Sequence, residues 1–339
     1  MEKFFDHSKM FKDNNLLLPN FHFNQFNNYI NNYKNSAHID VFVTYLTSKL
    51  VENGISPHFP LYYGSFSAIM EKFTIELSEK DDFENEVKND IIKVFNKGDK
   101  YYGEVNNFPC QFLASENLDG DLYNLRFRNE KSNQDEWLAY MFQITAALTV
   151  CQKYFGLCNN DLHSSNVMYK YIKEPFLYYK FKNKYYRIPT YNKLIKIIDW
   201  GRATFNWNGK KIKNTVFNTD NDCFGQYIFP VLPIIQKKHI DINNSMDLSL
   251  LSSDLLNDED GENIPNTTQN NLTNLLEELL KDRSGNLLEF DEDSFYVYKV
   301  IAKDTFSGVP KNQLSKKYFK LFEIKYNMIP KDHKIYHLD

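Results

Sequence analysis

The sequence predicts an α+β protein in which a small mixed part is followed by a larger, mainly helical part. Apolar residues recur at helical spacing in residues 38–53 and again in a segment that opens at Asn133. Short apolar runs typical of strands occur at 167–172 and 194–199. The 339 residues are 42% hydrophobic and 16% aromatic, which is enough for one large domain or two lobes with substantial cores.

In the first part, residues 1–37 form a polar, Asn-rich segment, and the helix at 38–53 is expected to end at Gly54. A charged stretch at 80–100 separates the strands that follow. We predict these strands at 61–65, 68–77 and 110–115.

The second part begins with a strong helix. Asn133 and Glu136 form a capping pattern at its start, and Gly156 is expected to end it. Its predicted apolar face consists of Trp137, Met141, Ile144, Leu148 and Cys151. A long insertion rich in Tyr and Lys joins the two predicted strands. Four further helices are predicted at 244–256, 270–282, 291–304 and 314–325.

Composition excludes several classes of function. A net charge of −4 with scattered lysines gives no reason to expect nucleic-acid binding. Four cysteines without CxxC spacing are expected to be reduced thiols. The N-terminus lacks the apolar core of a signal peptide, so we expect a protein that is not secreted. No window approaches about 18 uncharged apolar residues, so no membrane span is expected.

Two short motifs carry the chemistry. The first, Asn160 to Asn166, contains an aspartate and an asparagine in D-x-x-x-x-N spacing directly before an apolar strand. The second, Ile198-Asp199-Trp200-Gly201, sets a carboxylate at the end of another apolar strand. Alone, D-x-x-x-x-N is a weak signal, because Asp and Asn are common in turns. A lone carboxylate after a strand of buried type needs a partner, and a metal ion would supply one. Gly201 is expected to allow the chain reversal there.

With these motifs the chain resembles the eukaryotic-type protein kinase superfamily, and it is similar to the divergent kinase-like proteins of nucleocytoplasmic large DNA viruses. The resemblance covers roughly residues 38–325. It implies a two-lobed protein kinase-like fold with a truncated small lobe at 38–117 and a mainly helical large lobe at 118–339. The segments that carry it are Ser56 to Gly64, Cys110 to Leu118, Asp161 to Asn166, Asp199 to Arg202, Gly225 to Tyr227 and Ser245 to Leu248.

The resemblance also implies roles by position. Asp161 matches the catalytic base, and Asn166 and Asp199 match the Mg²⁺ ligands. Asp247 matches a buried aspartate that anchors the catalytic loop. The implied nucleotide contacts are the backbone of Glu116, Asn117 and Leu118, with Met168 beneath the adenine and Ser115 as gatekeeper. His163 matches a basic residue near the γ-phosphate, and a solvated loop histidine is an equally good interpretation of it.

Several residues depart from the kinase pattern. Asn159 and Asn160 replace the usual His-Arg, which argues against control by loop phosphorylation. The helix at 38–53 matches the regulatory helix, with Asp40 and Glu52 as its acidic residues. No glycine precedes that helix, so the Gly-rich loop over the phosphates is missing, and none of the preceding lysines lies in a strand-like sequence. Either the first strands of the small lobe have been lost, or the chain is truncated at its start.

The sequence leaves three functions open. The first is Mg-ATP-dependent phosphoryl transfer to Ser or Thr hydroxyls of proteins, with activity weakened by the missing loop and lysine. The second is a catalytically inactive pseudokinase scaffold. The third, less favoured, is a small-molecule phosphotransferase similar to aminoglycoside and choline kinases. ATP is the expected ligand, and the protein partner is undefined. The viral resemblance alone implies a location in the host cytoplasm or the virion.

Overall fold

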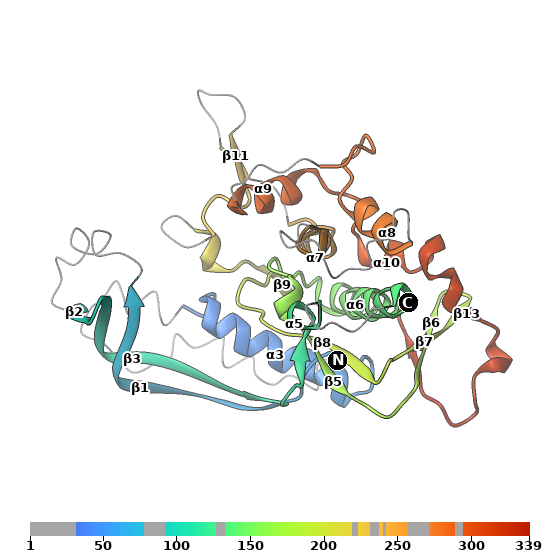
Figure 1. Cartoon of the computed structure of the whole chain (residues 1–339), viewed down its shortest axis with the longest axis horizontal. Coiled ribbons are helices and arrows are strands. Elements are labelled where there is room, and N and C mark those ends of the chain that lie inside the picture. Colours follow the sequence, from blue (N-terminus) through green and yellow to red (C-terminus); the bar gives the residue numbers. More distant parts are fainter. Residues whose placement is uncertain are drawn as a thin grey trace. The chain divides into compact units, whose positions relative to one another are not determined.

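The computed structural model contains both helices and strands (Figure 1). It describes residues 32–77, 92–126, 133–218, 223–230, 237–239, 242–256, 271–288 and 294–339. These residues divide into two compact units. The described part of the smaller unit comprises residues 32–35, 63–77 and 92–114, and the larger unit comprises the described residues of 36–62 and 115–339. Most of the predicted N-terminal segment 1–37 lies outside the described residues.

The smaller unit is built on a 3-stranded sheet in the order β1-β3-β2. Its strands are β1 (Tyr62–Leu77), β2 (Ile92–Lys97) and β3 (Lys100–Ser115). The predicted strands at 61–65 and 68–77 are one continuous strand, and β2 and β3 extend into the charged stretch at 80–100. Stacked aromatic pairs support β1 against β3, with ring centroids 4.9 Å apart for Phe66 and Phe112 and 4.4 Å apart for Phe73 and Phe108. Pairing of aromatic residues therefore extended these strands beyond the short apolar runs.

Helix α3 (Ser36–Glu52) belongs to the larger unit. The predicted boundaries, 38–117 and 118–339, placed it in the smaller part instead. The helix itself was predicted correctly, and Gly54 follows it with a φ of 66°. Phe42 packs on the rings of Phe205 and Trp207, at centroid distances of 5.8 and 5.2 Å. These contacts, together with the polar contacts of α3 described below, explain why it groups with the larger unit.

Helix α6 (Gln134–Phe155) is the central helix of the larger unit. As predicted, Asn133 caps its start, its side chain accepting a hydrogen bond from Asp135 N, and Gly156 ends it in the left-handed conformation with a φ of 55°. The helix is buried on all sides between Trp137 and Cys151, and not along one apolar face. This burial arises because other elements surround α6, which apolar spacing does not reveal.

The predicted strands at 167–172 and 194–199 are confirmed as β5 (Val167–Tyr171) and β8 (Lys193–Ile197). They pair antiparallel with Val167 opposite Ile197, and β4 (Gly120–Asp121) adds on the other side of β5, giving the order β4-β5-β8. The residues of the two sequence motifs lie before β5 and after β8. Because Val167 and Ile197 are register partners, the sheet brings the two motifs to the same end of the strand pair.

The Tyr- and Lys-rich insertion forms a hairpin of β6 (Phe176–Phe181) and β7 (Lys184–Pro189). It belongs to a 4-stranded sheet in the order β13-β7-β6-β14, in which β13 (Glu323–Ile324) and β14 (Ile335–His337) come from the end of the chain. Tyr179 and Tyr186 are fully buried, and their ring centroids lie 5.3 and 5.0 Å from that of Phe142 on α6. The insertion is therefore part of the core.

Most of the remaining helices agree with the predictions, but the helix expected at 314–325 is wrong. That segment is a 3₁₀ helix, η4 (Lys317–Phe322), followed by β13, with Phe319 packed on Phe142 at 5.1 Å between ring centroids. Residues three apart share a face in a 3₁₀ helix as well, so spacing did not separate the two forms. The other elements are α5 (Leu122–Arg126), α7 (Met246–Leu256), α8 (Asn271–Leu279), α9 (Ser294–Asp304), α10 (Pro310–Gln313), β9 (Phe205–Trp207), β10 (Lys210–Ile212), β11 (Ile228–Pro230) and β12 (Lys237–His239).

No helix among the described residues is both long and apolar enough to cross a membrane.

A buried histidine links the insertion to β8. His58 Nδ1 lies 2.8 Å from the carbonyl oxygen of Ile195, and Nε2 lies 2.6 Å from the hydroxyl of Tyr179. Since a carbonyl only accepts, Nδ1 carries the proton and Nε2 accepts from the tyrosine. Burial, with the nearby Lys196 cation adding to it, lowers the pKa of His58 to about 3. His58 is therefore a neutral core residue with a hydrogen bond at each ring nitrogen.

This burial predicts an acid-sensitive contribution to stability. The unfolded chain takes up a proton at His58 near pH 6.5, whereas the folded chain does so only near pH 3. The contribution of His58 is present above about pH 6.5 and falls by about 1.4 kcal/mol per pH unit below it. Urea unfolding of wild type and His58→Gln should therefore give a stability difference that shrinks from pH 7 to pH 5. The exposed His337→Gln should leave the pH dependence unchanged, and a constant difference for His58→Gln would contradict this assignment.

Candidate functional site

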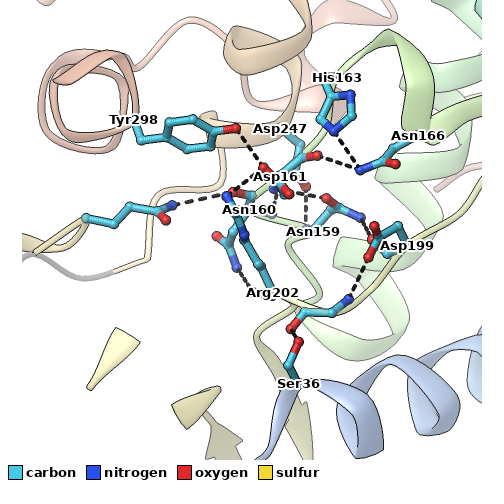
Figure 2. Close-up of polar contacts among 12 residues, drawn as sticks. Ser36, Asn159, Asn160, Asp161, His163, Asn166, Asp199, Arg202, Asp247 and Tyr298 are labelled. Atoms are coloured by element: carbon cyan, nitrogen blue, oxygen red, sulfur yellow. Dashed lines mark hydrogen bonds and ion pairs between the residues drawn. The ribbon is translucent and has the colours of Figure 1, made fainter. Parts of the chain in front are cut away.

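The loop from Asn159 to Asn166 is anchored by a buried carboxylate on α7. Asp247 is fully buried and accepts the backbone N–H of Asn159 at 3.0 Å and that of Asn160 at 2.8 Å (Figure 2). Burial raises the pKa of Asp247 to about 6, although the two backbone hydrogen bonds oppose the shift. The predicted role of Asp247 as the anchor of this loop is confirmed.

Asn160 links the anchored loop to the segment that follows Gly201. Its backbone has a φ of 67°, a left-handed conformation that Asn tolerates better than most residues. Its side-chain nitrogen donates to Arg202 O at 2.9 Å and to Thr204 Oγ1 at 3.1 Å. Its side-chain oxygen accepts from the hydroxyl of Tyr227, and Gln226 donates to its backbone oxygen at 3.4 Å. These hydrogen bonds between uncharged groups hold the segment after Gly201 in place, and they need no phosphate group on that segment.

Asp161 follows Asn160 in the loop, and one oxygen of its carboxylate already accepts hydrogen bonds. Oδ1 accepts from Arg202 Nη1 at 2.8 Å and from the hydroxyl of Tyr298 at 2.7 Å (Figure 2). The backbone N–H of Asp161 donates to Asn159 Oδ1 at 2.9 Å, which further fixes the turn. Arg202 was within a motif noted in the sequence, but no sequence signal pointed to Tyr298.

Asn166 faces back into the same loop and contacts His163. Its side-chain nitrogen donates to the backbone oxygen of Asp161 at 3.1 Å and lies 3.1 Å from His163 Nε2. Because the amide nitrogen is a donor, His163 Nε2 is the acceptor of this contact. His163 therefore lies against Asn166 within the loop. The oxygen of Asn166 is left without a partner among the described residues.

Asp199 differs from its prediction in two respects. The residue is exposed, so its carboxylate carries no burial penalty, and the argument from a buried lone charge does not hold. The left-handed conformation lies on Asp199 itself, with a φ of 58°, and not on Gly201. A Cβ on Gly201 would lie 2.9 Å from Ser36 Oγ, so the serine side chain would have to move. Asp199 Oδ1 accepts from Gly201 N at 3.1 Å, and its backbone oxygen accepts from Asn159 at 2.6 Å.

Helix α3 meets this motif through Asp40 and not through Glu52. Asp40 Oδ1 accepts the backbone N–H of Trp200 at 2.8 Å, and Ser36 Oγ donates to Gly201 O at 2.5 Å. Glu52 instead pairs with Lys49 on its own helix. Burial raises the pKa of Asp40 to about 6, and the Asp199 charge adds to the shift while the bond from Trp200 opposes it.

The side chain of Glu116 links neighbouring segments through two ion pairs and a hydrogen bond. Its carboxylate pairs with Lys170 at 2.6 Å and with the buried Lys196 at 2.8 Å, and it accepts from Leu61 N at 3.2 Å. Burial opposes ionisation, but the two lysine bonds outweigh it, so the pKa of Glu116 lies below its usual range. Its backbone N–H donates to Leu61 O at 2.8 Å. Sequence reasoning missed Lys196, because a lysine in an apolar strand gives no sign of its partner.

The other predicted nucleotide contacts lie on the strands and turns beside Glu116. Asn117 is exposed and Leu118 is half-buried, and the backbone N–H of Leu118 has no hydrogen-bond partner in the part of the chain that the structure describes. Met168 is half-buried on β5, where it is the register partner of Lys196 on β8 and of Asp121 on β4. Among the described residues, the backbone N–H of Leu118 is thus an unused donor.

Neither a protein-family model nor a curated protein matches this sequence.

Proposed function

We propose that the chain catalyses Mg-ATP-dependent phosphoryl transfer to Ser or Thr hydroxyls of protein substrates, on a protein kinase-like two-lobed fold. The observation that carries the proposal is the anchored loop: Asp247 holds the backbone of Asn159 and Asn160, and the loop in turn contacts both Asn166 and Asp199. A base and two oxygen ligands fixed in one hydrogen-bonded network are what phosphoryl transfer requires of a protein.

In this proposal Asp161 orients the attacking hydroxyl and accepts its proton. The hydroxyl oxygen forms a bond to the γ-phosphorus of ATP while the bond from that phosphorus to the leaving oxygen of ADP breaks, and ADP keeps the electron pair. Asp161 Oδ2 is the acceptor, because it has no partner among the described residues whereas Oδ1 has two. The neutral contacts of Asn160 keep the following segment in place without a phosphorylated loop.

Asn166 and Asp199 would hold Mg²⁺. The donors fit a hard cation, because the oxygen of Asn166 has no protein partner among the described residues and Asp199 is exposed. Within the same residues, no three His, Cys, Asp or Glu side chains are grouped to hold a metal ion. Two protein ligands suit Mg²⁺ at a phosphate site, where water and phosphate oxygens complete its shell. When bound, Mg²⁺ would neutralise charge on the phosphates.

A pseudokinase scaffold is the second candidate, because residues 1–35 of the sequence contain no glycine. Of the lysines that precede α3, Lys34 is described, and its ammonium lies 5.5 Å from the ring centroid of Tyr33. If no Gly-rich loop with its lysine covers the phosphates, their positioning depends on the metal ligands alone. A scaffold would tolerate Asp199→Asn without loss of function, whereas an enzyme would not.

Nucleotide binding is tested first by a thermal melt with ATP, with and without Mg²⁺. A ligand at about 100 times its dissociation constant adds about 2.7 kcal/mol to stability. We expect an upward shift that requires Mg²⁺ and is lost in Asp199→Ala. The control is Asp332→Ala, which changes an exposed aspartate elsewhere in the larger unit and should keep the shift. No shift at millimolar nucleotide would refute the enzyme and leave the scaffold. Transfer to small alcohols or amines, with none to protein, would instead indicate a small-molecule phosphotransferase.

A further inference from the structure

The carboxylate of Asp161 is held by two residues from outside its own loop. Arg202 follows the Asp199-Trp200-Gly201 motif, and Tyr298 lies on α9, far along the chain. Both donate to the same oxygen, Oδ1, at 2.8 and 2.7 Å (Figure 2). Bonding two donors to one oxygen fixes the rotation of the carboxylate and leaves Oδ2 available.

The two donors also contact each other, and both are permanent donors. The guanidinium carbon of Arg202 lies 5.6 Å from the ring centroid of Tyr298. Burial, with the Asp161 charge adding to it, raises the pKa of Tyr298 well above its usual range, so the phenol keeps its proton. Arginine remains protonated at any working pH. Neither donor can therefore become a competing base.

Helix α9 packs on α7, the helix that carries Asp247. Ile301 and Ala302 of α9 belong to a buried cluster with Met246 and Leu250 of α7, and Tyr298 packs against that cluster. The two α7 residues flank Asp247 in the sequence. The helix that anchors the loop of Asp161 therefore also supports the helix that carries Tyr298.

We propose that Arg202 and Tyr298 are positioning residues for phosphoryl transfer: they hold Asp161 through Oδ1 so that Oδ2 accepts the proton of the substrate hydroxyl. The inference rests on the proposed function and adds two residues to its site. It assigns α9 a part in the chemistry, although none of its residues needs to touch the substrate.

Steady-state kinetics of Tyr298→Phe, which removes only the hydroxyl, tests the inference. We expect kcat to fall about tenfold, with the KM for ATP and the Mg-ATP thermal shift unchanged, because positioning acts on the chemical step and not on nucleotide binding. Arg202→Gln should lower kcat at least as much, and Arg202→Lys should restore part of it. The matched control is Tyr296→Phe, an exposed tyrosine on the same helix, which should behave as wild type.

The outcomes separate the two proposals. An active wild type whose kcat is unchanged in Tyr298→Phe would overturn the positioning role and leave the proposed function standing. A fall in kcat with an equal loss of the Mg-ATP thermal shift would also overturn it, because the effect would then be one of general structure. A wild type that transfers no phosphate to any hydroxyl would overturn both.

Discussion

Replacing Asp247 by alanine is expected to destabilise the protein by about 2 to 6 kcal/mol. The substitution leaves the backbone N–H groups of Asn159 and Asn160 buried without an acceptor, and each such group costs about 1 to 3 kcal/mol. This is a large fraction of the usual 5 to 15 kcal/mol of a folded domain. Urea unfolding at about pH 7.5 measures it, above the pH near 6 at which the Asp247 carboxyl takes up a proton.

Two variants sharpen this test. Asp247→Asn keeps one acceptor oxygen and turns an NH₂ group toward the second N–H, so its loss of stability should lie between wild type and Asp247→Ala. Asp332→Ala removes an exposed carboxylate and should change stability by less than about 0.5 kcal/mol. Equal stability of Asp247→Ala and wild type would show that the loop does not depend on this carboxylate.

The second large effect is expected at Asp161. Asp161→Asn keeps an oxygen to accept from Arg202 and Tyr298 but removes the carboxylate that receives the hydroxyl proton in the proposed function. Loss of a general base lowers a rate by about 10²- to 10⁴-fold, so kcat for protein phosphorylation should fall by that amount while the Mg-ATP thermal shift is retained. Radiolabel transfer from ATP measures the rate.

Asp199→Asn is the variant to compare with Asp161→Asn, because the two substitutions should impair different properties of the protein. Asp199→Asn should lose nucleotide stabilisation and rate together, whereas Asp161→Asn should lose rate alone. If Asp161→Asn keeps the wild-type rate, Asp161 is not the base, whatever the behaviour of Asp199→Asn.

Local signals in the sequence predicted the scaffold of the site well. Asn133 and Gly156 are caps whose side chain and backbone act within a few residues, and β5 and β8 are short apolar runs. The resemblance also pointed to Asp247, whose buried carboxylate accepts two backbone N–H groups of the loop. The caps and the two strands are encoded close to the residues that they organise, whereas Asp247 lies far in the sequence from the loop that it holds.

Contacts between distant segments could not be predicted in this way. Tyr298 reaches Asp161 across the fold, and the buried Lys196 pairs with Glu116 from another segment. The exposure of Asp199 was also missed, because an apolar strand before a residue says nothing about the side of the chain on which the next carboxylate emerges. Periodicity reports neighbours in sequence, whereas these contacts are set by tertiary packing.

The strand order of the insertion sheet has a consequence for biosynthesis. β6 lies between β7, its neighbour in sequence, and β14, whose residue Ile335 pairs with Tyr178. While the ribosome makes the segments in between, one edge of β6 has no strand to bond with, and an unpaired edge invites pairing with other chains. The nascent protein thus passes through a period in which the edge of β6 is open to pairing with other chains, and this period ends when β14 emerges.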